Sequence, residues 1–491
     1  MQFKYLLFIA ATFFLMGCKK ILDVQPRDQF TAADLFTTKQ GFYAAATAIY
    51  DDLASQELYG RQMTFQSLDL MAKRYKLPSN ATQLYVYLPF INHNYGSGLP
   101  EMEQMWKKAY FRILSGNILM DHISRQQGIL TQEEADILQG EMLTARAFLH
   151  FDMLRLFGPR WEGNAALLSI PYHDQPKTTV LPLLTFEMVI EKIISDLDKA
   201  ETLLAKDPVI TQGPMASAPA ASESVHLRYR QFRFNYFSTI ALKARVYLYA
   251  GKKPEALATA KRLLADQKLH QHFPPVDAGG NLNNLVNPDR VFSSEVLTGI
   301  YLPERDTLHN HIFDQRTAEA SRFLQPYAGF IERLFAFGGS TGAKEYEDYR
   351  YQSHWEPATD PNIKGHIFTK YKPITQPAGS EYFYSRMIPL IRLSEVYYIA
   401  AESEPDPVDG YVWLNEMRPR RGLTPLSNFN SFIFPSLLAN EYLREFYGEG
   451  QAFYFFKRNA FRQRYENGSG LLYVFYTDAA YVPPLPPGEK K

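Results

Sequence analysis

Apolar residues recur at helical spacing along most of this chain, and this pattern constrains its fold more than any other feature. One long segment of this kind runs from Glu133 to Phe157 and ends at Gly158-Pro159, a pair that stops a helix. The same spacing appears in six further segments: Gln40–Leu53, Met102–Ser124, Thr185–Ala205, Phe234–Asp266, Ile388–Ser403 and Leu437–Arg458. The sequence therefore predicts a mostly α-helical body.

Two long stretches interrupt the helical pattern. Arg74–Pro100 contains two glycines and three prolines. Residues 270–384 contain short strand-like patches separated by many further glycines and prolines. Within the second stretch, Phe330–Phe337 still has a helical pattern. We expect both stretches to form long irregular loops on a helical scaffold, where ligand-binding groups are commonly placed.

The segment Phe234–Asp266 has the pattern of a tetratricopeptide-like helix pair. Small residues, among them Ala244 and Ala256, stand where two helices would approach closely. Gly251 ends the first helix and Pro254 begins the second. An ordinary helical hairpin would give a similar pattern, so both interpretations stay open.

The N-terminus has the layout of a secretory signal. Lys4 precedes an apolar run, Tyr5–Met16, that is too short to span a bilayer. The run ends at Leu15-Met16-Gly17-Cys18, which resembles a lipobox, so we predict cleavage after residue 17 and acylation of Cys18 by palmitate-type chains. A free or dimerising thiol is the alternative. Cys18 is the only cysteine, so a large core must stabilise the body without disulfides.

Charge and composition narrow the partners. The chain has 52 Lys and Arg against 52 Asp and Glu, and this balance argues against nucleic acid as the main partner. It also contains 32 Tyr, 35 Phe and 4 Trp. An excess of Tyr over Trp suits surfaces that combine apolar contact with hydrogen bonding, as ligand sites do.

Five blocks in order along the chain resemble the SusD/RagB family of outer-membrane nutrient-uptake lipoproteins. They are Cys18–Pro26; Trp106–Asn117; Gly140-Glu141 with Arg146–Phe148 and Leu154–Gly158; Ala241–Gly251 with Ile388–Tyr397; and Arg444-Glu445 with Glu449-Gly450 and Lys457-Arg458. The chain departs from the family pattern at Gly448, Ala452 and Phe455 and in Glu404–Pro407, which brings the packing of the last repeat into question.

The resemblance implies a function without catalysis. It implies a lipid-anchored, helical-repeat protein that lies over a SusC-like TonB-dependent barrel, binds a nutrient, commonly a glycan or oligosaccharide, and delivers it to that transporter. It implies no cofactor, and it places the protein on the cell outer membrane, facing the medium. We expect a signal peptide at 1–17, a SusD-like N-terminal region at 18–225 and a RagB/SusD region at 226–491.

Aromatic and amide side chains in the irregular stretches are the candidate ligand contacts, because a flat ring covers the apolar face of a sugar and an amide satisfies its hydroxyls. The candidates are Tyr87, Asn92, Tyr95, Tyr349 and Trp355. The alternative is that these rings anchor their own loops to the helical body.

Other patterns favour rival functions only weakly. Gly338–Gly342 matches G-x-S-x-G but lacks the strand that a nucleophile elbow needs before it. The histidine pairs His270/His272 and His309/His311 lack further metal-ligand signals, so we predict solvated loop histidines and no metal site. The acidic pairs Glu101/Glu103 and Glu347/Asp348 are expected on solvated faces. The rival functions are an α-helical glycoside hydrolase and a repeat scaffold that binds only proteins.

Overall fold

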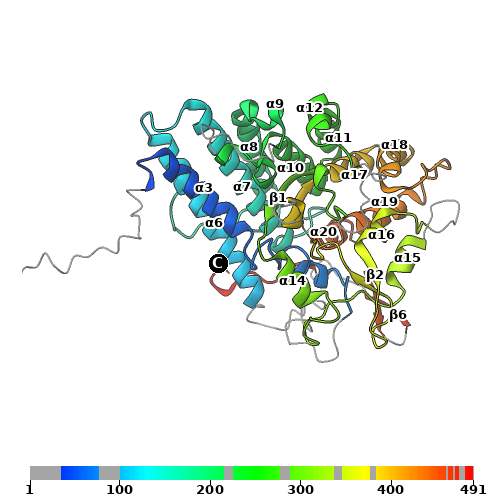
Figure 1. Ribbon diagram of the computed structural model, residues 1–491. Helices are drawn as coiled ribbons and strands as arrows, with labels where there is room; N and C mark the ends of the chain where they lie inside the picture. Colours follow the sequence, from blue (N-terminus) through cyan, green and yellow to red (C-terminus); the bar gives the residue numbers. More distant parts are fainter. Residues whose placement is uncertain are drawn as a thin grey trace, which may run out of the picture.

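The computed structural model describes residues 35–76, 100–214, 225–276, 288–336, 345–375, 383–460, 463–467, 470–474 and 481–489. Helices dominate it, which confirms the mostly α-helical prediction (Figure 1). The longer helices are α3 (Lys39–Leu53), α6 (Pro100–Arg125), α7 (Gln132–Phe157), α8 (Phe186–Leu203), α10 (Tyr236–Tyr249), α11 (Lys253–Leu264), α17 (Leu393–Ser403), α18 (Pro407–Met417), α19 (Phe434–Glu445) and α20 (Gln451–Arg458).

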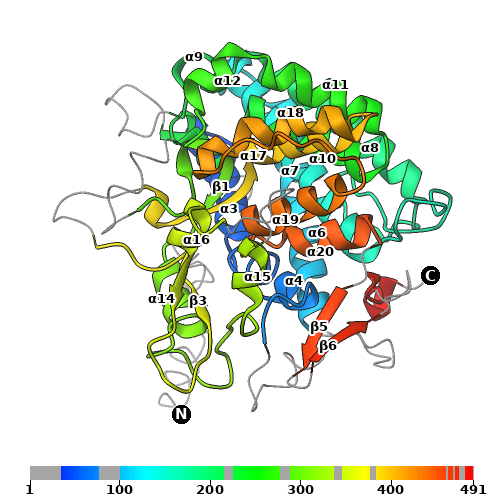
Figure 2. The same ribbon diagram turned by 90° about the vertical axis from the view of Figure 1, so that its right-hand side faces the viewer.

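These helices form a continuous stack. Each packs on the next in the order α3, α6, α7, α8, α10, α11, α17, α18 and α19, and Figure 2 shows α10, α11, α17 and α18 side by side. Six shorter helices lie between or beside them: α4 (Ser67–Met71), α9 (Val209–Gln212), α12 (Gln267–His272), α14 (Arg305–Ile312), α15 (Phe330–Ala336) and α16 (Tyr349–His354). Among the described helices, none is long and apolar enough to cross a bilayer.

Strands occur as three short antiparallel pairs. The pairs are β1 (Val296–Tyr301) with β4 (Met387–Arg392), β2 (Trp355–Pro357) with β3 (His366–Phe368), and β5 (Gln463–Asn467) with β6 (Gly470–Val474). The β1–β4 ribbon packs against α10 and α17, inside the helical stack.

Helix α7 forms where its sequence signals predict. Thr131 caps it, and the Thr131 hydroxyl and the Glu134 carboxylate form a reciprocal capping box. The helix ends before Gly158-Pro159, as predicted. It is buried along most of its length, from Ala135 onward, because both α6 and α8 pack on it.

The helix pair α10–α11 forms where the sequence predicts it, as both the tetratricopeptide-like repeat and the ordinary helical hairpin require. Ala244 and Ala256 are both fully buried, and α10 and α11 pack on each other. The turn between them contains Gly251 at φ +71°, and a Cβ there would come within 2.1 Å of the Trp161 ring. Glycine is therefore required by both the backbone conformation and the packing.

The predicted helix Ile388–Ser403 is wrong in its first third. Residues Met387–Arg392 form strand β4, in which Ile388 pairs with Ile300, and only Leu393–Ser403 is helical. All six residues of β4 are buried, so the strand lacks the alternation of apolar and polar residues that would distinguish it from a buried helix.

The predicted helix Leu437–Arg458 is divided in two. The chain bends between α19 and α20, where Gly448 and Gly450 have φ of +78° and +71°. A Cβ on Gly448 would come within 2.5 Å of Phe368, and the Gly448 amide donates a 2.9 Å hydrogen bond to Asp69 Oδ2. A bulky residue at 448 would therefore not fit here. In α20, Phe455 stacks on Tyr442 with ring centroids 4.4 Å apart.

A buried group of charged side chains, here called the ionic cluster, joins the C-terminal segments. It contains six cations and six anions, each no more than 8% exposed: Arg350, Lys370, Arg392, Arg418, Arg421 and Arg444 with Glu295, Glu345, Asp348, Glu441, Glu445 and Glu449. Glu445 lies at its centre and accepts hydrogen bonds from Arg350 (3.0 Å), Arg392 (2.5 Å) and Arg421 (2.6 and 2.9 Å).

The ionic cluster holds elements that are far apart in sequence. Arg392 ends β4, Arg421 ends the short helix η8 (Pro419–Arg421), and Glu445 ends α19. Glu295 accepts two further bonds from Arg421, at 2.7 and 2.8 Å, and so fixes the start of β1. A buried charge is strongly unfavourable without its partner, so each segment must keep the position at which its charges are paired. The bonds of the ionic cluster therefore fix the irregular segments on the helical stack.

Candidate functional site

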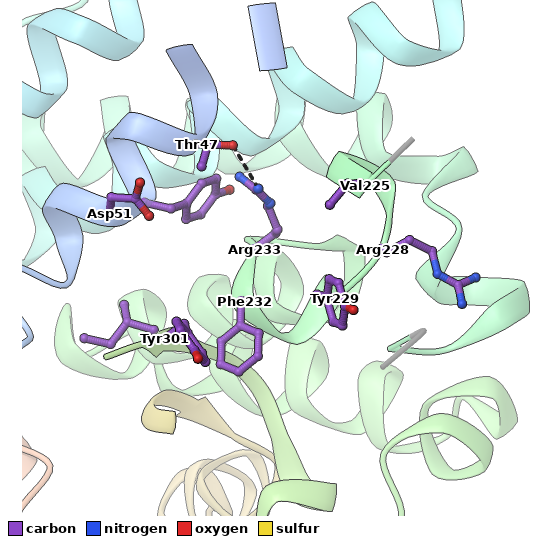
Figure 3. Close-up of a pocket in the computed structure, with 10 residues that line it drawn as sticks. Thr47, Asp51, Val225, Arg228, Tyr229, Phe232, Arg233 and Tyr301 are labelled. Atoms are coloured by element: carbon purple, nitrogen blue, oxygen red, sulfur yellow. Dashed lines mark hydrogen bonds between the residues drawn. The ribbon is translucent and has the colours of Figure 1, made fainter. Parts of the chain in front are cut away.

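A half-open pocket of about 280 Å³ lies where α3, the segment from Val225 to Arg233 and the end of β1 meet (Figure 3). The segment contains two single-turn 3₁₀ helices, η3 (Val225–Leu227) and η4 (Arg230–Phe232). The pocket is lined by Thr47, Tyr50, Asp51, Val225, Arg228, Tyr229, Phe232, Arg233, Ile300 and Tyr301.

Aromatic rings form one wall of this pocket. Tyr301 is the last residue of β1 and is 40% exposed. Its ring centroid lies 5.6 Å from that of Phe232, and the two ring planes meet at 83°. Tyr229 lies beside Phe232 (Figure 3) and has a left-handed backbone, with φ +52°. Such strain in a non-glycine residue is uncommon and clusters at ligand sites.

Polar side chains form the opposite wall. Thr47 and Asp51 lie one turn apart on α3 and therefore share a helix face. Arg233 Nη2 donates a 3.1 Å hydrogen bond to Thr47 Oγ1, and its guanidinium carbon lies 4.7 Å from the centre of the Tyr50 ring. Figure 3 shows Thr47, Asp51 and Arg233 on the side opposite Phe232 and Tyr301.

Buried hydrogen bonds fix this wall to the helical stack. The Tyr50 hydroxyl donates to Glu141 Oε2 at 3.1 Å and accepts from the Phe234 amide at 3.1 Å. Beneath it, Arg230 donates to Asp207 at 2.7 and 2.9 Å and to Glu141 Oε1 at 2.5 Å. Since Glu141 lies on α7 and Arg230 on η4, these bonds hold the pocket rigidly in place.

Burial shifts the pKa values of two groups that line the pocket. Loss of hydration raises the pKa of Asp51; Arg233 opposes this shift and Asp52 adds to it. Burial also raises the pKa of Tyr50 well above its usual value, so its hydroxyl stays protonated at neutral pH. The pocket therefore offers the Thr47 hydroxyl, the Asp51 carboxylate and the Arg233 guanidinium opposite an apolar surface.

This arrangement suits a ligand with an apolar face and a fringe of hydrogen-bonding groups. The aromatic wall can cover the face, while Thr47, Asp51 and Arg233 can satisfy the fringe. Within the described ranges, no three His, Cys, Asp or Glu side chains come together so that they could hold a metal ion.

A known protein family resembles this chain in sequence, and known structures resemble it in fold. Residues 22–227 match the SusD-like family model described as starch-binding and associating with the outer membrane. A SusD superfamily protein from Bacteroides vulgatus, 20% identical, superposes with a TM-score of 0.68 over 92% of this chain and 96% of its own. The N-terminal part of the chain thus matches the SusD-like family, and the chain as a whole shares the fold of SusD superfamily proteins.

Two further members of this family with solved structures have carbohydrate ligands in their descriptions. A SusD-like carbohydrate-binding protein from Bacteroides vulgatus is 19% identical, with a TM-score of 0.64 over 87% of this chain and 84% of its own. A laminarin-binding SusD-like protein is 16% identical, with a TM-score of 0.60 over 86% of this chain and 92% of its own. At these identities the likeness establishes the fold. No curated protein matches this chain in sequence.

Four of the predicted site residues lie outside the described residues. They are the predicted lipidation site Cys18 and the predicted ligand contacts Tyr87, Asn92 and Tyr95. The stretch Gly338–Gly342 also lies outside them. The roles assigned to these positions stay predictions.

The two remaining ligand candidates lie away from the pocket. Trp355 begins β2 and is only 5% exposed, with its ring centroid 4.6 Å from that of Tyr447 and 5.3 Å from that of Phe368. Tyr349 begins α16, is half-buried and lies against Gly422. The burial of Trp355 matches the alternative that its ring anchors its own segment. Ligand contact by either residue stays a prediction.

Two predicted solvated positions are buried instead. His309 belongs to α14, is 4% exposed and has Nε2 3.2 Å from the Phe368 carbonyl oxygen. Burial lowers its pKa to about 4. Asp348 is fully buried and pairs with Arg350 at 2.6 Å within the ionic cluster. The predictions that these two residues are solvated are wrong, because the segment that contains Phe368 packs on His309 and the ionic cluster brings Arg444 to within 3.8 Å of Asp348.

Sequence reasoning did not find the pocket. Its three lining segments are separated by more than 60 residues from one another, and none carries a recognised motif. The one local signal is the cluster Tyr229, Phe232 and Arg233, which follows the Pro-rich stretch Gly213–Ser224 and precedes α10. Aromatic and basic residues at the end of a loop, just before a helix, can indicate such a wall.

Proposed function

We propose that this SusD-like protein is a lipid-anchored binding subunit that captures a glycan at the cell surface and delivers it to a SusC-like TonB-dependent outer-membrane transporter. The observation that carries the proposal is the match of residues 22–227 to a family described as starch-binding and associating with the outer membrane. Starch and laminarin are both neutral glucans, so we propose a glucan as the ligand.

The pocket supports binding without chemistry. Its aromatic wall at Phe232 and Tyr301 and its polar wall at Thr47 and Asp51 match the two kinds of surface on a sugar ring. The ligand contacts predicted in the loops, Tyr87, Asn92, Tyr95, Tyr349 and Trp355, belong to the same proposal as further contacts along a longer chain. A carrier for import must also release its ligand, which favours moderate affinity.

The test is a binding screen of the mature protein. We expect purified protein to bind starch- and laminarin-derived oligosaccharides on a glycan array and in calorimetry, and to leave them uncleaved on chromatography. The matched control is Phe432→Ala, which removes a ring that is 94% exposed and lies outside the pocket. Absence of binding to every glycan would contradict the proposal, and cleavage products would favour the glycoside hydrolase.

The anchor and the partner need separate tests. Mass spectrometry of the native protein should find acyl chains on Cys18 after removal of residues 1–17, and Cys18→Ser should release the protein from membranes. Co-purification from solubilised membranes should recover a large TonB-dependent β-barrel. A stable barrel complex without any glycan binding would favour the scaffold alternative.

A further inference from the structure

We propose that the pocket between α3 and β1 binds the end of a neutral glucan chain, one or two sugar units, rather than a stretch from its middle. This inference rests on the proposed function, because it states which part of the glucan this site takes. Three observations support it: the size of the pocket, the angle between its two main rings and the chemistry of its polar wall.

The size of the pocket limits the ligand. Pockets that enclose drug-sized molecules measure about 300–1,000 Å³. A volume of about 280 Å³ lies just below this range and suits a mono- or disaccharide. A longer segment would have to continue out of the pocket into solvent or onto other parts of the protein.

The aromatic wall forms a corner and not a flat platform. The planes of Phe232 and Tyr301 meet at 83°, with their centroids 5.6 Å apart. A sugar that stacks on one ring therefore meets the edge or face of the other ring at its side. The corner blocks extension of the chain in that direction, whereas coplanar rings would let successive sugars stack along them.

The polar wall can recognise what distinguishes a chain end. A terminal sugar has a free hydroxyl where an internal sugar has a glycosidic oxygen, and a hydroxyl can both donate and accept. Asp51 offers an acceptor, and Arg233, which also bonds to Thr47, offers a donor on the same wall. A site built to bind a hydroxyl discriminates strongly against a ligand that lacks it.

The test compares linear and cyclic glucans on the full mature protein. The probes are maltose, maltotriose and maltoheptaose, laminaribiose and laminariheptaose, and β-cyclodextrin, a ring of seven glucose units that has no chain end. Calorimetry measures each probe with the wild type, Tyr301→Ala, Phe232→Ala and the control Phe432→Ala. Circular dichroism verifies that each variant is folded.

We expect Tyr301→Ala and Phe232→Ala to weaken binding of the linear probes about fivefold to tenfold, by the same factor at every length. Neither variant should change the affinity for β-cyclodextrin. The control Phe432→Ala should leave the affinity for every probe unchanged. Asp51→Asn should weaken the linear probes selectively in the same way, which a purely structural role would not do.

Three results would overturn the inference. One is an equal loss for β-cyclodextrin and maltoheptaose, which would show that the pocket takes internal sugars. Another is wild-type binding that no pocket variant weakens, which would leave the glycan function intact but place its site elsewhere. The third is no binding of either linear series, which rejects a glucan-end site, while the glycan array decides separately whether the protein binds any glycan.

Discussion

The ionic cluster and the pocket use the same kinds of residues in opposite ways. In the cluster, Glu445 is fully buried and each of its oxygens accepts from two arginines. At the pocket, Asp51 is exposed at the rim, and Arg233 bonds to a hydroxyl instead of a carboxylate. The difference teaches that burial and pairing, not residue type, separate a structural charge from one available to a ligand.

The pKa shifts of the two regions have opposite signs. Burial alone would raise the pKa of Glu441, but Arg350, Arg444 and Arg418 outweigh it and lower the pKa to about 2. At Asp51 the loss of hydration prevails over Arg233, and the pKa rises. The fold therefore stabilises the charge in the cluster, whereas it tolerates an unfavourable charge at the pocket. Such unfavourable groups are common at functional sites.

The largest expected effect is that of Glu445→Ala. Removal of this carboxylate leaves Arg350, Arg392 and Arg421 buried with fewer partners, so the free energy of unfolding should fall by about 3–5 kcal/mol. Urea denaturation of the purified protein measures it. The control is Glu103→Ala, which removes an exposed pair with Lys107 and should cost less than about 1 kcal/mol. Equal losses in the two variants would break the comparison.

The second prediction concerns the stability of the protein at acidic pH. Because the folded-state pKa of Glu441 is depressed to about 2, its stabilising effect is complete above pH 4.5 and is lost as pH falls toward 2. Over this window Glu441 should contribute about 3 kcal/mol to the decline in unfolding free energy. Urea denaturation at several pH values would compare the wild type with Glu441→Gln. A stability difference that stays constant from pH 5 to pH 2.5 would contradict the shift.

Asp51→Asn should have the opposite effect on stability to Glu441→Gln. A raised folded-state pKa means that the charged form opposes folding, so the variant should be at least as stable as the wild type at pH 7. The disadvantage of the wild type should disappear as pH falls toward the ordinary pKa of the carboxyl. Thermal denaturation at pH 7 and pH 3.5 measures this. A clear loss of stability in the variant at pH 7 would place Asp51 with the structural charges.

The smallest expected loss of stability is that of Tyr301→Ala. The ring is 40% exposed at the end of β1 and packs against Phe232, so the free energy of unfolding should fall by about 1 kcal/mol. Glucan binding by the same variant should nevertheless weaken, which sharpens the contrast with Glu445→Ala. Should Tyr301→Ala destabilise the fold by several kcal/mol, the pocket wall would instead be part of the core.

Sequence reasoning succeeded where a local signal sufficed. The start of α7 follows from Thr131 and Glu134, its end from Gly158-Pro159, and the α10–α11 turn from Gly251 and Pro254. It failed where the signal depended on distant neighbours. Strand β4 lacks alternation because both of its faces are buried, and the break between α19 and α20 depends on the ring of Phe368.

The same division holds for the candidate site. The order of the family blocks along the chain indicated the SusD/RagB family, and family membership carries the expectation of a glycan. The individual contacts could not be chosen in this way, since Trp355 is buried against Tyr447 and the pocket joins Thr47, Phe232 and Tyr301 from three separate segments.

The amino-acid sequence is enough to predict a mostly α-helical chain, because helix period, caps and helix-ending glycines act over a few neighbouring residues. Which charges are structural and which face the pocket becomes clear from the three-dimensional packing alone. Burial and pairing depend on which residues from elsewhere in the chain pack on a side chain. For this reason the pKa of Glu441 is lowered, whereas that of Asp51 is raised.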